Sequence, residues 1–198
     1  MEVYWRTLRD FKGDHVTKET VLAMKPTSEL HFIKQNIGED KLEDAHRIMM
    51  QYYERLHDEL FGGVYPGIPG LLEAIRGDGF TTGIVTGKSR RAWQITSKKV
   101  RLGMFDSIIV DDNVDHPKPH PQGMRRALDD LKVSPEETLY VGDTVSDYNA
   151  ACAAGIRGVL VLWAKSDREK EKFIARAREQ GAKEFYEHPD KLMHDLIQ

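Results

Sequence analysis

The clearest indication of the fold is the segment Thr138-Leu139-Tyr140-Val141-Gly142-Asp143-Thr144-Val145-Ser146-Asp147. It begins as a short apolar run typical of a buried β-strand, and the run ends in Gly-Asp with a second aspartate one helical turn later. Open parallel sheets bind their ligands beyond the carboxyl ends of the strands. The pattern therefore predicts that Asp143 and Asp147 lie together at such an end.

Short apolar runs alternate with helical stretches on both sides of this segment. The predicted strands are residues 80–86, 105–110, 138–142, 158–163 and 184–186. The predicted helices between and after them are residues 90–100, 122–131, 147–154, 166–180 and 189–196. Strands that alternate with helices in this way form a parallel sheet covered by helices on both faces. We therefore predict an α/β fold.

The first 60 or so residues differ from the rest, because apolar residues recur there at helical spacing and no run predicts a strand. Glycine and proline are concentrated in residues 62–70, which we interpret as a linker. The prediction is a small helical domain at residues 1–63 followed by an α/β domain at residues 64–198.

Composition limits the classes of function. The 198 residues are 40% hydrophobic and 31% charged, with a net charge of −3, so no basic surface for nucleic acid is indicated. No apolar run approaches the roughly 20 residues that span a bilayer. The single cysteine, Cys152, excludes an intramolecular disulfide and favours a cytoplasmic location. Its small-residue surroundings predict that it packs in the core.

Two further segments could act with the acid pair. In His116-Pro117-Lys118-Pro119-His120-Pro121, alternating prolines hold the chain extended and could direct Lys118 towards a phosphate. At the end of the strand at residues 80–86, the Thr86 hydroxyl and the Gly87 amide could donate to a phosphoryl oxygen. The simpler alternatives are a solvated lysine in a surface loop and a threonine that caps the next helix.

The acid pair itself also has two interpretations. Two carboxylates at one strand end repel each other unless a cation or proton neutralises them, and Mg²⁺ binds carboxylates while keeping water and contacting phosphate. The alternative is that Asp143 caps the following helix and Asp147 is solvated.

Taken in chain order, Thr86, Lys118 and Asp143 with Asp147 resemble the second, third and fourth motifs of the haloacid dehalogenase superfamily. The resemblance covers residues 62 to 198 and is greatest to its phosphoglycolate phosphatase and β-phosphoglucomutase branch. It implies a Rossmann-like core with a helical cap. It also implies that Thr86 binds the phosphoryl group, that Lys118 stabilises it, and that Asp143 and Asp147 hold Mg²⁺.

One motif of that family has no counterpart in this chain. Family members carry a strand that ends in Asp-x-Asp before the cap, and its first aspartate attacks phosphorus. Here no apolar run precedes an early aspartate, and the missing strand would lie centrally, between those at residues 80–86 and 138–142. Three explanations are open: an internal start within a longer protein, a partner or swapped segment, and pairing of the two flanking strands with each other.

The resemblance implies a Mg²⁺-dependent phosphohydrolase acting on a small phosphorylated metabolite, with no nucleic acid or membrane partner. Without the nucleophile motif, we expect little or no turnover from these 198 residues. The rivals are a module that binds a phosphorylated ligand without hydrolysing it and a fragment that depends on a partner, for which a homodimer is one form.

Overall fold

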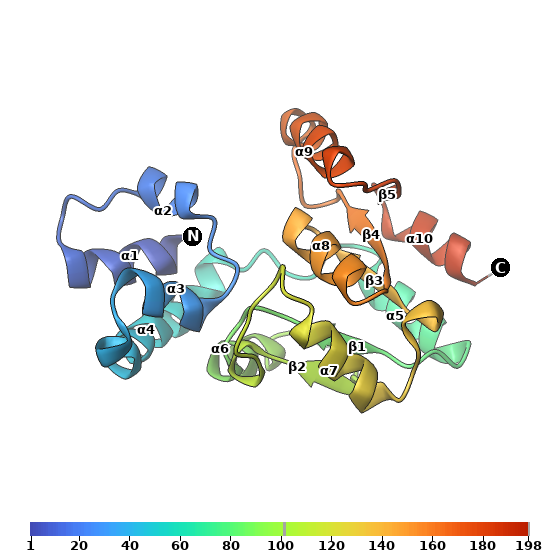
Figure 1. Cartoon of the computed structure of the whole chain (residues 1–198), viewed down its shortest axis with the longest axis horizontal. Helices are drawn as coiled ribbons and strands as arrows, with labels where there is room; N and C mark the ends of the chain where they lie inside the picture. The colour runs from blue at the N-terminus through green and yellow to red at the C-terminus, as the bar shows by residue number, and fades with distance from the viewer. Residues whose placement is uncertain (101, 198) are drawn as a thin grey trace. The chain divides into compact units, whose positions relative to one another are not determined.

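The computed structural model describes residues 1–100 and 102–197. Their contacts define two compact units (Figure 1). The first combines Met1–Gly63 with Thr86–Val100 and Val110–Pro117, and the second combines Val64–Val85 with Arg101–Ile109 and Lys118–Gln198. We call them the helical unit and the sheet unit.

The helical unit contains helices and no strand among its described residues. Its elements are α1 (Glu2–Lys12), α2 (Lys18–Met24), α3 (Glu29–Asn36), the short 3₁₀ helix η1 (Glu39–Lys41), α4 (Leu42–Leu60), α6 (Arg90–Ser97) and the 3₁₀ helix η2 (Asp111–Asn113). This confirms the helical prediction for the first 60 residues. The predicted helix at residues 90–100 is shorter, since α6 ends at Ser97.

The core of the helical unit brings early and late parts of the sequence together. Ile33 and Met49 are fully buried, and Ala92 and Ile95 of α6 pack in the same cluster. Tyr4 packs edge-to-face on Phe32, with ring centroids 5.0 Å apart. Burying the apolar faces of α1, α3, α4 and α6 against one another is the main source of this unit's stability.

The sheet unit contains the predicted alternation of strands and helices. Its strands are β1 (Gly83–Val85), β2 (Ser107–Ile109), β3 (Leu139–Gly142), β4 (Arg157–Val161) and β5 (Phe185–Tyr186). Its helices are α5 (Ile68–Gly77), α7 (Gln122–Leu131), the 3₁₀ helix η3 (Pro135–Glu137), α8 (Val145–Ala153), α9 (Asp167–Glu179) and α10 (Pro189–Leu196). The α/β prediction is therefore confirmed, and α7 and α10 have the predicted bounds.

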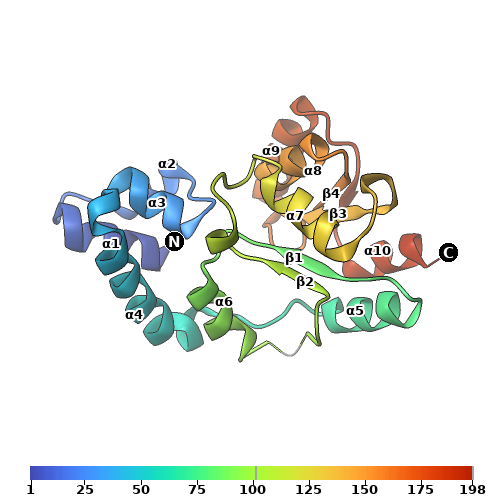
Figure 2. The ribbon, with the colours of Figure 1, turned by 60° about the horizontal axis from the view of Figure 1, so that its bottom comes forward.

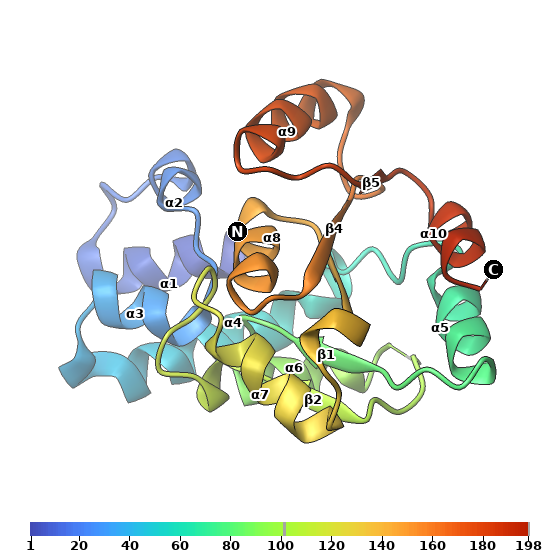
Figure 3. The same ribbon diagram turned by 45° about the vertical axis from the view of Figure 1, so that its right-hand side comes forward.

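All strand pairs are parallel, but they form two separate sheets. β1 pairs with β2, which lies beside it in Figure 2, and β3, β4 and β5 form a three-stranded sheet in that order. Helix α7 packs on β1 and β2, and α8 packs on β3 and β4. Helices α5 and α10 lie against each other, as Figure 3 shows.

The separation of the sheets falls between β1 and β3, where the family resemblance places the missing strand. Among the described residues, β1 pairs only with β2 and β3 only with β4. The explanation in which the two flanking strands pair with each other is therefore wrong. Val141 of β3 is 39% exposed, although a strand in the middle of a covered parallel sheet is buried on both faces.

Two other expectations need correction. Helix α5 begins at Ile68, so Pro69 and Gly70 lie in its first turn rather than in a linker. Proline is tolerated there because the first amides of a helix have no intrahelical partner. Cys152 is exposed, whereas Ala150 and Ala151 are fully buried. Helix α8 turns Ala150 and Ala151 towards the sheet and Cys152 outwards.

Candidate functional site

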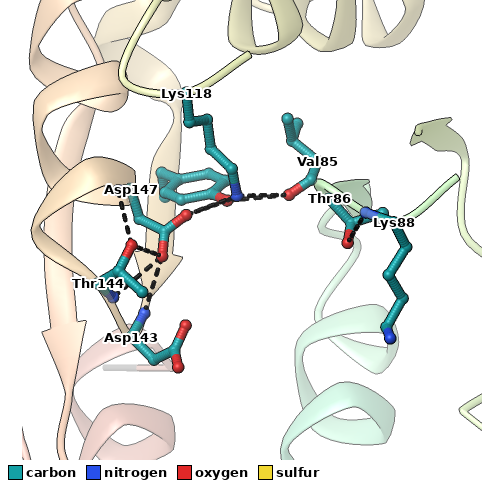
Figure 4. A network of polar contacts seen from close by, with 8 residues as sticks. Val85, Thr86, Lys88, Lys118, Asp143, Thr144 and Asp147 are labelled. Carbon is teal, nitrogen blue, oxygen red and sulfur yellow. Dashed lines mark hydrogen bonds and ion pairs between the residues drawn. The ribbon is translucent and has the colours of Figure 1, made fainter. Parts of the chain in front are cut away.

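The sheet unit places Lys118 against Asp147. The Nζ atom of Lys118 lies 2.6 Å from Oδ1 of Asp147, and their side chains are only 16% and 6% exposed (Figure 4). Lys118 lies in the loop before α7, and Asp147 lies in the first turn of α8. The alternative of a solvated Lys118 is therefore wrong, and so is that of a solvated Asp147.

The carboxylate of Asp147 has hydrogen bonds on both oxygens. Oδ1 accepts from Lys118 and, at 3.3 Å, from the Tyr140 hydroxyl. Oδ2 accepts from the amides of Asp143 and Thr144 and, at 2.7 Å, from the Thr144 hydroxyl. The Thr144 hydroxyl in turn accepts from the Asp147 amide, so Thr144, and not Asp143, caps α8.

The two aspartates have pKa values shifted in opposite directions. Burial raises the pKa of Asp147, but the Lys118 ammonium and the hydrogen bonds from Lys118 and Thr144 outweigh burial and lower it. Desolvation and the neighbouring Asp147 charge raise the pKa of Asp143, against the opposing effects of Lys165 and Lys118. Asp147 is therefore the fixed counter-ion of the lysine, whereas the Asp143 carboxylate has no ion pair among the described residues and is only partly compensated by Lys165 and Lys118.

Tyr140 is a residue that the sequence analysis did not single out. Its hydroxyl donates to the carbonyl oxygen of Val85 at 3.1 Å, and the same carbonyl lies 3.2 Å from Nζ of Lys118. Val85 ends β1, so side chains occupy a carbonyl that a neighbouring strand would otherwise use. Burial and the Asp147 charge raise the pKa of Tyr140 well above the usual range, which keeps it a hydroxyl donor.

The acid pair offers one open carboxylate for a metal ion. Figure 4 shows the Asp143 carboxylate directed away from the hydrogen bonds around Asp147. Within residues 1–100 and 102–197, no three His, Cys, Asp or Glu side chains form a group that could hold a metal by themselves. Mg²⁺ commonly uses one or two protein carboxylates together with water and substrate phosphate. Asp143 fits that mode, while the oxygens of Asp147 are already engaged.

Thr86 and Gly87 belong to the helical unit by their contacts. The Thr86 hydroxyl accepts from the Lys88 amide at 3.2 Å, and the hydroxyl of Ser89 caps α6 by accepting from Ala92. The alternative in which Thr86 caps the next helix is therefore wrong. A Cβ atom on Gly87 would lie 1.8 Å from the carbonyl oxygen of Thr27, so only glycine fits at this position.

Two buried carboxylates hold this loop and the adjoining start of α3, and no sequence motif marks either of them. Glu29 accepts from the Ser89 amide at 2.8 Å, while its own amide donates to the Gly87 carbonyl. Asp111 accepts from the Ser28 hydroxyl and the Leu30 amide, each at 2.7 Å. Burial is the largest influence on both groups and raises both pKa values. Ser28 also caps α3, because its hydroxyl accepts from the His31 amide.

The helical unit also has a solvent-open cavity of about 290 Å³ beside this loop. Its lining includes Thr86, Gly87 and Lys88 from the loop, together with Tyr4 and Tyr53 from α1 and α4. Each unit thus gathers part of the predicted set: Lys118, Asp143 and Asp147 in the sheet unit, and Thr86 and Gly87 in the helical unit.

Comparison with known proteins gives one family. The haloacid dehalogenase-like hydrolase family matches residues 1–161. A pyrophosphatase PpaX from Bacillus mycoides is 32% identical over 166 residues, which cover 83% of this chain and 76% of the relative. No described helix has both the length and the apolar character needed to cross a membrane.

Solved structures share the fold at lower identity. A hydrolase from Pseudomonas syringae has a TM-score of 0.77 at 23% identity, covering 98% of this chain and 88% of its own. A candidate phosphoglycolate phosphatase from Lactobacillus plantarum has a TM-score of 0.75 at 21% identity, with the same coverages of 98% and 88%. CbbY from Rhodobacter sphaeroides, solved with phosphate, has a TM-score of 0.68 at 21% identity, covering 81% of this chain and 79% of its own.

Proposed function

The chain belongs to the haloacid dehalogenase-like hydrolase family, and we propose that its function is that of a Mg²⁺-dependent phosphohydrolase of the phosphoglycolate phosphatase type. The proposed substrate is a small phosphorylated metabolite. The observation that carries the proposal is the buried Lys118–Asp147 pair beside the open carboxylate of Asp143, at the carboxyl end of β3. A cation and a free carboxylate at such an edge suit phosphate chemistry.

Each site residue has a proposed role. Lys118 would neutralise charge on the phosphoryl group, and Asp147 would hold Lys118 in position through the 2.6 Å ion pair. The Thr86 hydroxyl and Gly87 amide would donate to phosphoryl oxygens. Asp143 would be the protein ligand of Mg²⁺, which, when bound, would stabilise negative charge on the phosphate.

The names of the relatives support a small substrate that carries two anionic groups. Pyrophosphate and phosphoglycolate, which the names of relatives indicate, each carry a second ionised group beside the phosphoryl group. Another structure of CbbY, a mutant, contains xylulose-1,5-bisphosphate, which also has two anionic ends. We place the reaction in the cytoplasm, with residues 1–63 as the cap domain and residues 64–198 as the core, and keep a homodimer as an arrangement to test.

Turnover requires a nucleophile, and the sheet unit is divided where the family strand that carries it would lie. We therefore expect the 198 residues alone to hydrolyse p-nitrophenyl phosphate with Mg²⁺ at a rate near the background. Robust turnover that the Asp143→Asn substitution abolishes would overturn this expectation and identify a nucleophile elsewhere. Asp167→Asn, at a fully exposed side chain, is the matched control.

The second candidate is a module that binds a phosphorylated ligand without hydrolysis. It is favoured by the cavity of about 290 Å³, which is bordered by Thr86 and Lys88 and does not require a nucleophile to bind an anion. Binding of inorganic phosphate measured by calorimetry, with and without Mg²⁺, separates the two. The enzyme proposal places Mg²⁺ at Asp143 beside the phosphate, so phosphate binding that Mg²⁺ strengthens and that Asp143→Asn weakens supports the enzyme. Equally tight binding with and without Mg²⁺ supports the module.

A further inference from the structure

The cavity in the helical unit has a lysine held in a defined position. Nζ of Lys88 lies 2.5 Å from the Tyr53 hydroxyl and 4.6 Å from the centre of the Tyr53 ring. The Tyr53 hydroxyl is in turn 2.7 Å from the Thr96 hydroxyl. A lysine side chain has considerable rotamer entropy, which these contacts reduce before any ligand binds.

The backbone that carries Lys88 is also fixed. Glu29 contacts the residues on both sides of it: its carboxylate accepts from the Ser89 amide and its amide donates to the Gly87 carbonyl. The Lys88 carbonyl accepts from the Asp111 amide at 2.9 Å, which ties the loop to η2. The ammonium group of Lys88 is therefore presented to the cavity from a rigid support.

Charge in the cavity favours an anion at Lys88. Glu29 also lines the cavity, but its Oε2 is engaged by the Ser89 amide, and burial raises the pKa of its carboxyl group. The hydroxyl groups of Thr86 and Tyr53 line the same space and can donate hydrogen bonds. A cavity of about 290 Å³ is at the lower end of ligand pockets, which restricts the occupant to a small molecule.

We propose that Lys88 binds the second, non-reacting anionic group of the substrate and thereby selects small phosphate compounds with two ionised ends. Tyr53 is its positioning residue. This inference rests on the proposed function, in which Thr86 binds the phosphoryl group that reacts. The proposed substrate class is a pyrophosphate or a phosphorylated small carboxylic acid, because Thr86 and Lys88 line the same small cavity of about 290 Å³.

The test compares two probes that differ by one anionic group. Inorganic phosphate and inorganic pyrophosphate are titrated by calorimetry into the 198-residue protein at fixed Mg²⁺. We expect pyrophosphate to bind about tenfold more tightly than phosphate, as one added charge-assisted hydrogen bond predicts. Lys88→Gln should remove this preference and leave phosphate affinity within about twofold, while Lys88→Arg should retain it.

Two further variants make the result specific. Arg91→Gln, at a half-exposed side chain near Glu54, is the matched control and should change neither affinity. Tyr53→Phe removes only the hydroxyl and should reduce the pyrophosphate preference by about threefold, since the Lys88 side chain loses one of its contacts. Circular dichroism of each variant confirms that its helices are intact.

The outcomes separate the inference from the function that it rests on. Phosphate binding without a pyrophosphate preference, or equal weakening of both probes by Lys88→Gln, would overturn the role of Lys88 and leave the proposed function in place. Failure of both probes to bind the unmodified protein would overturn the two together. A preference that Lys88→Gln abolishes and Lys88→Arg keeps supports the inference.

Discussion

Both units bury carboxylates, but they stabilise them in different ways. In the sheet unit, Asp147 has an ammonium partner at 2.6 Å as well as amide and hydroxyl donors. In the helical unit, Asp111 is held by the Ser28 hydroxyl and the Leu30 amide, and Glu29 by the Ser89 amide. The carboxylate in the sheet unit is thus in direct contact with a positively charged donor, whereas those in the helical unit accept hydrogen bonds from neutral donors.

The pKa values follow this difference. Burial disfavours the charged form of all three carboxyl groups, and only at Asp147 do the lysine and the added hydrogen bonds reverse its effect. Asp147 therefore stays ionised and holds the Lys118 side chain in position through the 2.6 Å ion pair. Glu29 and Asp111 connect segments far apart in sequence and hold the Thr86–Ser89 loop, a task for which neutral donors suffice.

The largest expected effect is loss of the charge at Asp147. Asp147→Asn keeps the shape but turns an NH₂ group towards either Lys118 or the Thr144 donors, and it leaves a largely buried ammonium without its counter-ion. Removing one partner of a buried pair costs about 3 kcal/mol or more, which urea unfolding at pH 7 will measure. Asp167, whose side chain is fully exposed in its pair with Lys170, is the control: Asp167→Asn should cost no more than about 0.5 kcal/mol. A loss below 1 kcal/mol at Asp147 would show that the ion pair does not distinguish the units.

Packing around the loop gives the next largest effect. Gly87→Ala would place a Cβ atom 1.8 Å from the Thr27 carbonyl oxygen, a backbone group that cannot rotate away. We expect a loss of about 2 kcal/mol in unfolding free energy, as overpacking typically produces. Gly70→Ala, where the added methyl meets nothing within 4 Å in a helix, should be neutral or slightly stabilising. Equal stability of the two variants would show that the loop is not rigidly held.

The sequence was sufficient for the order of elements in both units, because apolar spacing reports which faces are buried. Helices α7 and α10 match their predicted bounds, whereas β1 is shorter than the predicted strand at residues 80–86. A strand ends where its hydrogen-bonding partner ends, and β2 pairs with only three residues of β1. That limit depends on a segment distant in sequence, so no local pattern reveals it.

The candidate site was predictable only where a motif marked it. Lys118 and Asp147 were found because each lies in a recognisable spacing of residue types. From sequence, Tyr140 has the position of an ordinary residue in an apolar strand, and Glu29 has that of a polar residue in the first turn of a helix. Their roles come from contacts with Val85 and Ser89, which lie 55 and 60 residues away in the chain. Cys152 was misplaced because alanines on all sides left the buried face of α8 undetermined.

A smaller effect is expected at Asp111. Both hydrogen bonds end on the same oxygen, Oδ2, so the amide oxygen of Asp111→Asn can accept from Ser28 and Leu30 in the same geometry. Only the added strength of a charged acceptor is lost, and a charge that burial already disfavours is removed. We expect a loss of about 1 kcal/mol at pH 7, measured by urea unfolding. Asp111→Ala, which leaves the Leu30 amide and Ser28 hydroxyl without an acceptor, should cost about 2 kcal/mol or more. A loss at Asp111→Asn as large as that of Asp147→Asn would contradict the comparison between the units.

The smallest expected effect is a difference in sign: the stability contributions of Asp147 in the sheet unit and Glu29 in the helical unit should change in opposite directions as the pH rises. The folded pKa of Asp147 is lowered, so its contribution to stability is complete above the usual aspartate range near pH 4 and is lost as the pH falls through the folded value. The folded pKa of Glu29 is raised, so its contribution decreases as the pH rises from about 4 through the folded value. The advantage of the unmodified protein over Asp147→Asn should therefore grow with rising pH at the acid end. Its advantage over Glu29→Gln should shrink from pH 4 towards pH 7, because the glutamine stays neutral while the unmodified protein gains a charge that burial disfavours. Urea unfolding midpoints of the three proteins across this range provide the measurement. Parallel pH profiles for the two substitutions would contradict the conclusion that contact with Lys118 sets the charge state of Asp147 apart from that of Glu29.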